Sequence, residues 1–136
     1  MSAIPLIKSI MTPSPHAIEK DGSVEQAQKI MLDCTIRHLP VVENSKPIGI
    51  LSDRDIALAL LVNNGMETAS SLKVEDICTL DAFNVDVNDT LDDIAFIMAE
   101  KHIGSVLVTD SEKLVGIFTA TDACEYLGHC LRSKSA

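Results

Sequence analysis

Two short segments of the chain combine residue types that suit the binding of a phosphorylated sugar. They are Gly49-Ile50-Leu51-Ser52-Asp53-Arg54-Asp55 and Gly116-Ile117-Phe118-Thr119-Ala120-Thr121-Asp122. In each, an apolar run typical of a strand leads directly into a helical pattern. The Ser or Thr hydroxyl therefore lies beside the unpaired N–H groups of a helix start, which attract phosphate. The carboxylate three residues later repels phosphate, but it accepts hydrogen bonds from a pair of sugar hydroxyls. The pattern predicts a nucleotide site at each segment.

The same segments also have a purely structural interpretation. Ser-x-x-Asp at a helix start is an ordinary N-cap with a favourable acid in the first turn, and a duplicated cap would recur in both places. The basic residues Arg37 and His38, directly before the apolar run 39–42, discriminate better, because they could neutralise a phosphate near Ser52. A solvated pair of surface side chains is the alternative for these two residues.

An internal repeat defines the elements that must position these segments. A shift of 67 residues aligns residues 7–56 with 74–123 without a gap. Ten of the 50 aligned pairs are identical, where unrelated sequences give about three. Each copy has the same order of signals: a short apolar segment, an amphipathic helix, two strands joined by a tight turn, and a closing helix. The sequence therefore predicts an α+β protein made of two β-α-β-β-α units.

The periodicity of the apolar residues sets the expected boundaries. The first helix of each copy begins at Ser23 or Thr90, and its apolar residues recur at helical spacing. We expect strands at 39–42, 48–51, 106–109 and 114–118, and closing helices at 53–62 and 121–131. The expected organisation is a first repeat with the N-terminal segment (1–62), a polar linker (63–71), a second repeat (72–131) and a frayed C-terminus (132–136).

The composition argues against several classes of function. A chain of 136 residues that is 46% apolar fits one compact soluble domain. The net charge of −9, without a basic patch, argues against nucleic acid and anionic membranes as partners. No apolar run approaches the ~20 residues that span a bilayer, and no secretory signal is recognisable, so we expect a cytoplasmic protein. The four cysteines form no Cys-x-x-Cys pair, which predicts reduced structural thiols and no metal site.

The first copy resembles a cystathionine-β-synthase (CBS) domain through three motifs in order: Ile10-Met11-Thr12, Ile36-Arg37-His38-Leu39-Pro40-Val41-Val42 and the segment 49–55. The second copy resembles another, so residues 7–124 are similar to a tandem CBS pair, or Bateman module. Each motif is weak alone, whereas the ordered set duplicated at a fixed offset is specific. The resemblance implies a regulatory fold whose two repeats pack with pseudo-twofold symmetry, leave two clefts for adenosine-containing ligands, and commonly form flat dimers.

The resemblance also implies the ligands and the residues that bind them. The ligands of the family are AMP, ADP, ATP, S-adenosylmethionine and, in some members, cyclic dinucleotides, and they regulate without serving as catalytic cofactors. The first cleft would combine Ser52, Asp55, Arg37, His38 and Ile50 with Thr79, Phe83 and Asn84. The second cleft would combine Thr119, Asp122 and Ile117 with Thr12, His16 and Ala17.

The second copy departs from the family pattern at the positions of the cations. Gly104-Ser105 stands in place of Arg37-His38, and Thr121 stands in place of Arg54. Lys101-His102, at the end of the preceding helix, could compensate, although cations at a helix end also interact with the helix dipole. We therefore rank the first cleft above the second.

Three hypotheses for the function follow. The first is a non-catalytic sensor of adenine nucleotides, a homodimer whose ligand-dependent shape or packing is read by a partner protein. The second is a structural or dimerisation module with degenerate ligand sites, which the altered second cleft and the apolar composition favour. An enzyme ranks third, because the four histidines are dispersed and no Ser or Cys nucleophile has an evident base.

Overall fold

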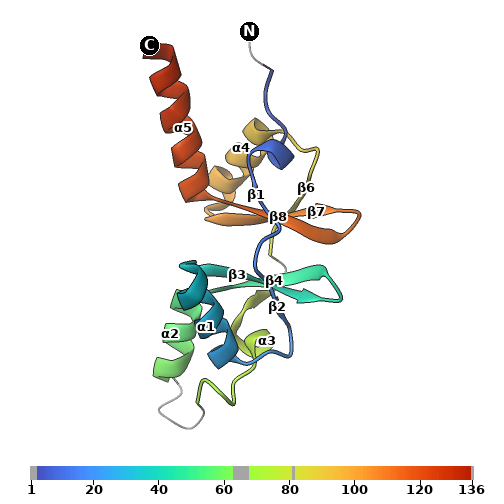
Figure 1. The fold of residues 1–136 in the computed structure, drawn as a ribbon, viewed down its shortest axis with the longest axis vertical. Coiled ribbons are helices and arrows are strands. Elements are labelled where there is room, and N and C mark those ends of the chain that lie inside the picture. Colours follow the sequence, from blue (N-terminus) through green and yellow to red (C-terminus); the bar gives the residue numbers. More distant parts are fainter. Residues whose placement is uncertain (1–2, 63–67, 81, 136) are drawn as a thin grey trace. The chain divides into compact units, whose positions relative to one another are not determined.

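The chain folds into two compact units. The computed structural model describes residues 3–62, 68–80 and 82–135 (Figure 1). Unit 1 consists of Met1–Pro15 and Phe83–Ala136, and unit 2 consists of His16–Ala82. Each unit has one four-stranded mixed sheet with helices, so the predicted α+β class with two copies of one motif is confirmed.

Unit 2 is built on a sheet of order β2-β3-β4-β5. Strands β2 and β3 are parallel, and the β3–β4 and β4–β5 pairs are antiparallel. The helix α1 crosses between the two parallel strands, and α2 begins at the residue that follows β4. The elements are β2 (Ile18–Glu19), α1 (Val24–Cys34), β3 (His38–Glu43), β4 (Lys46–Ser52), α2 (Asp53–Val62), α3 (Val74–Ile77) and β5 (Thr79–Leu80).

Unit 1 repeats this arrangement with a sheet of order β6-β7-β8-β1. Its hairpin strands and first helix begin and end 67 residues after their counterparts in unit 2, which is the offset predicted from the sequence. The β-bulges also correspond, at Val41/Val42 and at Val108/Thr109. The elements are the 3₁₀ turn η1 (Ile7–Ser9), β1 (Thr12–Pro13), β6 (Asn84–Asp86), α4 (Leu91–Lys101), β7 (Ser105–Asp110), β8 (Lys113–Thr119) and α5 (Ala120–Ser135).

The edge strand of each sheet comes from the other sequence copy. Strand β1, near the start of the first copy, pairs with β8 of the second, and β5, near the start of the second copy, pairs with β4 of the first. The pairing satisfies backbone groups of β4 and β8 that would otherwise be an open sheet edge. The compact units therefore divide the chain differently from the sequence repeats, with Met1–Pro15 in the unit of the second copy.

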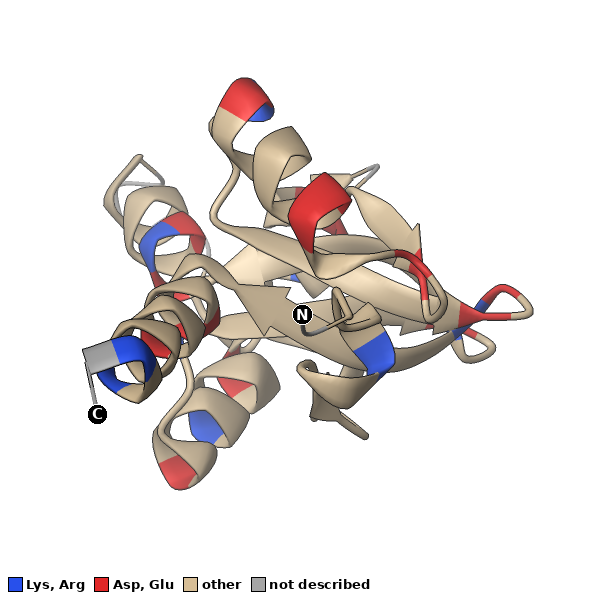
Figure 2. Cartoon of the chain, turned by 90° about the horizontal axis from the view of Figure 1, so that it is seen from above, with Lys and Arg blue, Asp and Glu red and all other residues tan. Residues whose placement is uncertain are grey.

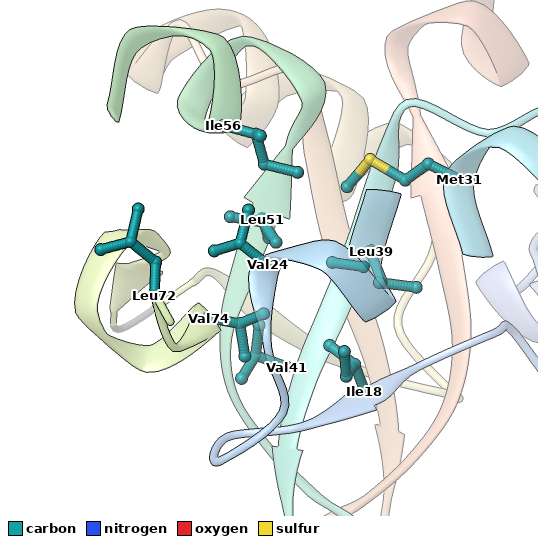
Figure 3. Packing of buried hydrophobic residues seen from close by; sticks show 10 residues of the cluster. Ile18, Val24, Met31, Leu39, Val41, Leu51, Ile56, Leu72 and Val74 are labelled. Atoms are coloured by element: carbon teal, nitrogen blue, oxygen red, sulfur yellow. The ribbon is translucent and has the colours of Figure 1, made fainter. Parts of the chain in front are cut away.

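The core of unit 2 lies between its sheet and its helices (Figure 3). Side chains from β2, β3 and β4 meet side chains from α1 and α2 and from the segment around α3. The predicted apolar face of α1 is confirmed, because Val24, Ala27 and Met31 are buried and Ile30 packs against the cluster. The buried members are Ile18, Val24, Ala27, Met31, Leu39, Val41, Leu51, Ile56, Leu72 and Val74.

The core of unit 1 uses many of the same repeat positions. Phe118 and Ile94 are among the largest fully buried side chains, and Ile7 of the N-terminal segment is also completely buried. Burial of Ile7 explains why Met1–Pro15 belongs to this unit, since removing its apolar surface from water stabilises the association.

Figure 2 shows that charged residues lie mainly on helices, loops and hairpin ends, whereas the strands are largely uncharged.

Each of the four hairpin strands extends one or two residues beyond both expected ends, and the last helix differs more. Helix α5 continues to Ser135 and so includes most of the segment expected to fray. Arg132 and Lys134 lie in its last turn, where positive charge interacts favourably with the helix dipole. Of the expected linker, 63–67 lie outside the described residues, and Thr68 and Ser71 form a turn closed by their own hydrogen bonds.

Candidate ligand-binding site

The turn from β4 into α2 is held by a reciprocal pair of hydrogen bonds between Ser52 and Asp55. The Asp55 backbone N–H donates to the Ser52 hydroxyl oxygen at 3.0 Å, and the Ser52 backbone N–H donates to Asp55 Oδ2 at 3.0 Å. Both residues are half-buried. The motif therefore does form a helix cap. Whether it can also bind a ligand depends on the hydrogen bonds that the Ser52 hydroxyl and the Asp55 carboxylate can still make.

The turn from β8 into α5 has the same geometry. The Asp122 backbone N–H donates to Thr119 Oγ1 at 3.2 Å, and the Thr119 backbone N–H donates to Asp122 Oδ2 at 2.9 Å. Both residues are half-buried, as in unit 2. The two sequence copies thus present one hydroxyl and one carboxylate in the same arrangement, once in each unit.

Capping leaves these side chains able to bind a ligand as well. A hydroxyl has one donor and two acceptor positions, and the cap uses one acceptor of Ser52 and one of Thr119. Among the described residues, neither hydroxyl has an acceptor for its own proton, so each can donate to a phosphate or another oxygen. An ionised carboxylate has about four lone-pair positions, so Asp55 and Asp122 can still accept from sugar hydroxyls.

Arg37 and His38 lie beside the turn of unit 2, as the sequence predicted. The Asp53 backbone N–H, at the first position of α2, donates to the Arg37 carbonyl at 3.0 Å, and His38 is the register partner of Ser52. Arg37 and Arg54 are exposed, and neither forms an ion pair with the described part of the chain. The turn and the residue hydrogen-bonded to it thus carry two exposed arginines that have no ion-pair partner in the described part of the chain.

The corresponding positions in unit 1 have no such charges. The Ala120 backbone N–H donates to the Gly104 carbonyl at 2.8 Å, and Ser105 is the register partner of Thr119. These contacts place Gly104 and Ser105 where unit 2 has Arg37 and His38. The departure noted in the sequence is therefore located at the turn itself.

The exchanged edge strands bring two further predicted residues into register with the strands that lead into the turns. Thr79 of β5 pairs with Ile50 of β4, and Thr12 of β1 pairs with Ile117 of β8. Both threonines are exposed. Each unit therefore contains the central isoleucine and the edge-strand threonine of one predicted cleft.

Four predicted residues belong to the opposite unit from the rest of their cleft. Phe83 and Asn84, predicted for the first cleft, lie in unit 1, where the Lys101 ammonium is 5.7 Å from the centre of the Phe83 ring. His16 and Ala17, predicted for the second cleft, lie in unit 2. Their roles remain predictions.

The close approach of β5 to β4 depends on a glycine. A Cβ atom at Gly49 would be 2.5 Å from the Thr79 carbonyl oxygen and 3.2 Å from the Cys78 sulfur. In unit 1, a Cβ at Gly116 would meet the Met11 side chain.

Cys78 thus occupies the place in unit 2 that Met11 has in unit 1. Burial raises the pKa of the Cys78 thiol, which keeps it protonated. All four cysteines are free.

Unit 1 contains a polar pocket of about 320 Å³ that extends the predicted site along α5. Two of its lining residues, Thr12 and Asp122, were predicted from the sequence, whereas Glu125, Tyr126 and His129 were not. The signal for these three is their spacing of three, four and seven residues from Asp122, which places all four on one face of a helix.

Unit 2 contains an apolar groove of about 460 Å³ between α1 and α2. Met31, Leu32, Ile36, Ile56 and Leu60 are among its lining residues.

Within 3–62, 68–80 and 82–135, no three His, Cys, Asp or Glu side chains are grouped so as to hold a metal ion. Within the same ranges, every helix is too short or too polar to cross a membrane.

Known proteins with the same organisation match along most of the chain. The structure of the CBS domain pair of protein MJ0100 in complex with 5′-methylthioadenosine and S-adenosyl-L-methionine is 30% identical, with a TM-score of 0.82, and the match covers 93% of this chain and 98% of that one. A putative acetoin utilization protein (AcuB) from Vibrio cholerae is 27% identical, with a TM-score of 0.84, covering 98% and 97%.

A relative of known sequence is much longer than this chain. L-aspartate semialdehyde sulfurtransferase of Methanocaldococcus jannaschii is 32% identical over 93% of this chain but only 24% of its own length. The chain spans about a quarter of the length of this relative and of two others named as enzymes. The family model for the CBS domain matches twice, at residues 7–62 and 74–129, which are the two copies of the repeat. With its duplicated turns, its exchanged edge strands and these matches, the chain belongs to the CBS domain family, as a tandem pair.

Proposed function

We propose that this chain is a non-catalytic regulatory module that binds an adenosine-containing ligand at its strand-to-helix turns. The Ser52 hydroxyl, whose proton has no acceptor among the described residues, would donate to the phosphate, with Arg37 and His38 neutralising its charge. The Asp55 carboxylate would accept hydrogen bonds from the ribose hydroxyls.

The observation that carries the proposal is the spare capacity of the capping pairs. In each unit the pair forms the helix cap and still offers a hydroxyl donor and carboxylate acceptors. The ligands named for the CBS pair of MJ0100, both of them adenosine derivatives, support the ligand class. The module would signal by a change of conformation or dimer packing that a partner protein reads, which requires different ligand affinities in the two states.

Calorimetric titration tests the ligand assignment. We expect AMP, ADP, ATP or S-adenosylmethionine to bind the wild-type chain, and Asp55→Ala to weaken the nucleotide at least tenfold. Gln26→Ala is the matched control, because Ser23 and Gln26 form the same reciprocal cap at α1 with bonds of 3.0 and 3.1 Å, outside the predicted clefts. Absence of binding by all four ligands at millimolar concentration, or equal effects of the two variants, would contradict the proposal.

The exposed apolar side chains of unit 2 favour a second candidate function, dimerisation independent of a ligand. Leu58, Leu61 and Val62 form one stripe on α2 and are 58%, 75% and 71% exposed, and Leu32 on α1 is 80% exposed. Sedimentation with and without nucleotide distinguishes the candidates. A dimer that Leu61→Glu dissociates, in a chain that binds none of the four ligands, favours the structural module, whereas a monomer under all conditions excludes it.

A further inference from the structure

The two copies of the site differ in charge at equivalent positions. Around the turn of unit 2, Arg37 and Arg54 balance the charges of Asp53 and Asp55. The equivalent four residues of unit 1 are Gly104, Thr121, Ala120 and Asp122, which leave one negative charge unbalanced. The difference is fixed by structure and not only by alignment, since the backbone hydrogen bonds of Arg37 and Gly104 at the two turns are the same.

The polar pocket of unit 1 adds a second difference. Its lining includes the carboxylates of Asp122 and Glu125, and no Lys or Arg is among the described residues that line it. Tyr126 and His129 complete the same face of α5. In the first copy, the positions of Glu125, Tyr126 and His129 are Leu58, Ala59 and Val62, which are apolar. Beyond the capping pair that both copies share, the additional polar and charged side chains are therefore at the turn in unit 2 and along the helix in unit 1.

The groups along this face favour a positive or neutral ligand over an anion. His129 Nε2 is 3.8 Å from Glu125 Oε1, and both side chains are 70% exposed, so they can rearrange around a ligand. A hydrogen bond with Cys130 raises the pKa of Tyr126, so its hydroxyl stays protonated and uncharged. A phosphate in this pocket would face two carboxylates without a fixed cation, which is unfavourable.

We propose that the two copies select ligands by charge: unit 2 binds a phosphorylated adenosine, and the pocket of unit 1 binds an adenosine whose 5′ substituent is cationic or uncharged. Thr12 and Asp122 hold the nucleoside, and Glu125, with Tyr126 and His129 beside it, faces the 5′ substituent. This inference rests on the proposed function, because it assigns a ligand class to each of the same two sites.

Titration of the full chain with AMP, S-adenosylmethionine and 5′-methylthioadenosine tests the division. We expect Asp55→Ala to weaken AMP at least tenfold and leave S-adenosylmethionine unchanged, and Asp122→Ala to do the reverse. Glu125→Gln should weaken S-adenosylmethionine several-fold and 5′-methylthioadenosine less, because only the former carries a positive charge. Glu100→Gln, an exposed substitution on α4 outside the pocket lining, is the control and should change neither.

Substitutions that are expected to create AMP binding at the second copy test the division without relying on a loss of binding, which misfolding could also cause. A Cβ atom at Gly104 would meet no atom within 4 Å, and Thr121 is exposed, so both positions are open for the double substitution Gly104→Arg with Thr121→Arg. When this pair is added to Asp55→Ala, we expect the affinity for AMP to rise about tenfold over that of Asp55→Ala alone, through binding at the second copy. AMP binding that depends on Asp122 in the wild type, or AMP and S-adenosylmethionine both lost with Asp55→Ala, overturns the division but not the proposed function. Failure of all three ligands to bind the wild type overturns both.

Discussion

At the strand-to-helix turn of unit 2, the Ser52 hydroxyl caps the helix and can also donate a hydrogen bond to a ligand. Ser52 accepts one hydrogen bond from the Asp55 backbone, as Ser23 accepts one from Gln26 at the start of α1. Such a cap stabilises a helix by about 1 kcal/mol whether or not a ligand binds. Ser23 has a basic bridge partner too, Lys73, so Ser52 differs from it in the Asp55 carboxylate, which takes the place of the Gln26 amide, and in the Arg37–His38 pair beside it.

Replacing Arg37 tests whether it binds a phosphate or is only a solvated surface residue. We expect Arg37→Ala to weaken AMP about tenfold and to leave adenosine binding unchanged, because charge-assisted hydrogen bonds are the stronger ones. Its effect on the free energy of unfolding should be within about 0.5 kcal/mol, because the side chain is exposed and has no ion pair among the described residues. Calorimetry and urea denaturation measure the two quantities.

The control for Arg37→Ala is Lys29→Ala, an exposed cation on α1. Lys29→Ala removes the same net charge from the same unit, so a purely long-range effect would appear in both variants. Equal weakening of AMP by the two substitutions would contradict a direct role for Arg37.

Part of the site could be predicted from residues and part could not. The pairs Ser52/Asp55 and Thr119/Asp122 were recognisable because a hydroxyl and a carboxylate three residues apart at a helix start imply a specific geometry. Glu125 and His129 were not recognised, because polar residues on one face of a surface helix are indistinguishable in sequence from an ordinary solvated face. Only the pocket at that face gives them significance.

At the scale of elements, the site depends on how closely an edge strand approaches β4. Strand β5 has only two residues, Thr79 and Leu80, and it is positioned by its pairing with Gly49 and Ile50. The absence of a side chain at Gly49 permits this approach, because the Thr79 carbonyl occupies the space that a Cβ would need. Thr79 therefore reaches its place beside Ile50 through backbone packing.

Adding a methyl group at this glycine should disturb unit 2 more than the equivalent change disturbs unit 1. We expect Gly49→Ala to destabilise the protein by about 1–3 kcal/mol, because the Cβ meets backbone that cannot move alone. Gly116→Ala should cost less, because the obstructing atoms belong to the flexible Met11 side chain. Urea denaturation gives the two free energies, and amide exchange in β3 and β7 assigns each loss to a unit. A larger effect of Gly116→Ala would contradict this account of the packing.

The elements themselves were largely predictable, whereas the exchange of edge strands was not. Alternating and helical apolar patterns extend over the hairpins and first helices, so these were found with their common offset. Strands β1 and β5 have two residues each, too few for a periodicity, and their partners are distant in the sequence. Which sheet edge they join is decided by tertiary packing, including the burial of Ile7 and Val74.

At the scale of the molecule, duplication has produced two units with the same architecture and different surfaces. Each has its own apolar core and its own sheet, so each can keep its turn in place while residues around the turn change. The cations at the turn of unit 2 and the carboxylates along α5 of unit 1 are such changes. A duplicated fold can thus acquire two ligand preferences without a second architecture.

Amide chemical-shift mapping of the full chain with AMP tests most directly whether a ligand binds at the capped turn. The account predicts that the largest changes occur at the amides of Ser52 to Asp55 and at Arg37 and His38, and that Asp55→Ala abolishes them. The turn at Ser23 and Gln26, which has the same reciprocal cap with an amide in place of the carboxylate, should not respond. Changes confined to that control turn, or no changes at millimolar AMP, would contradict the central claim.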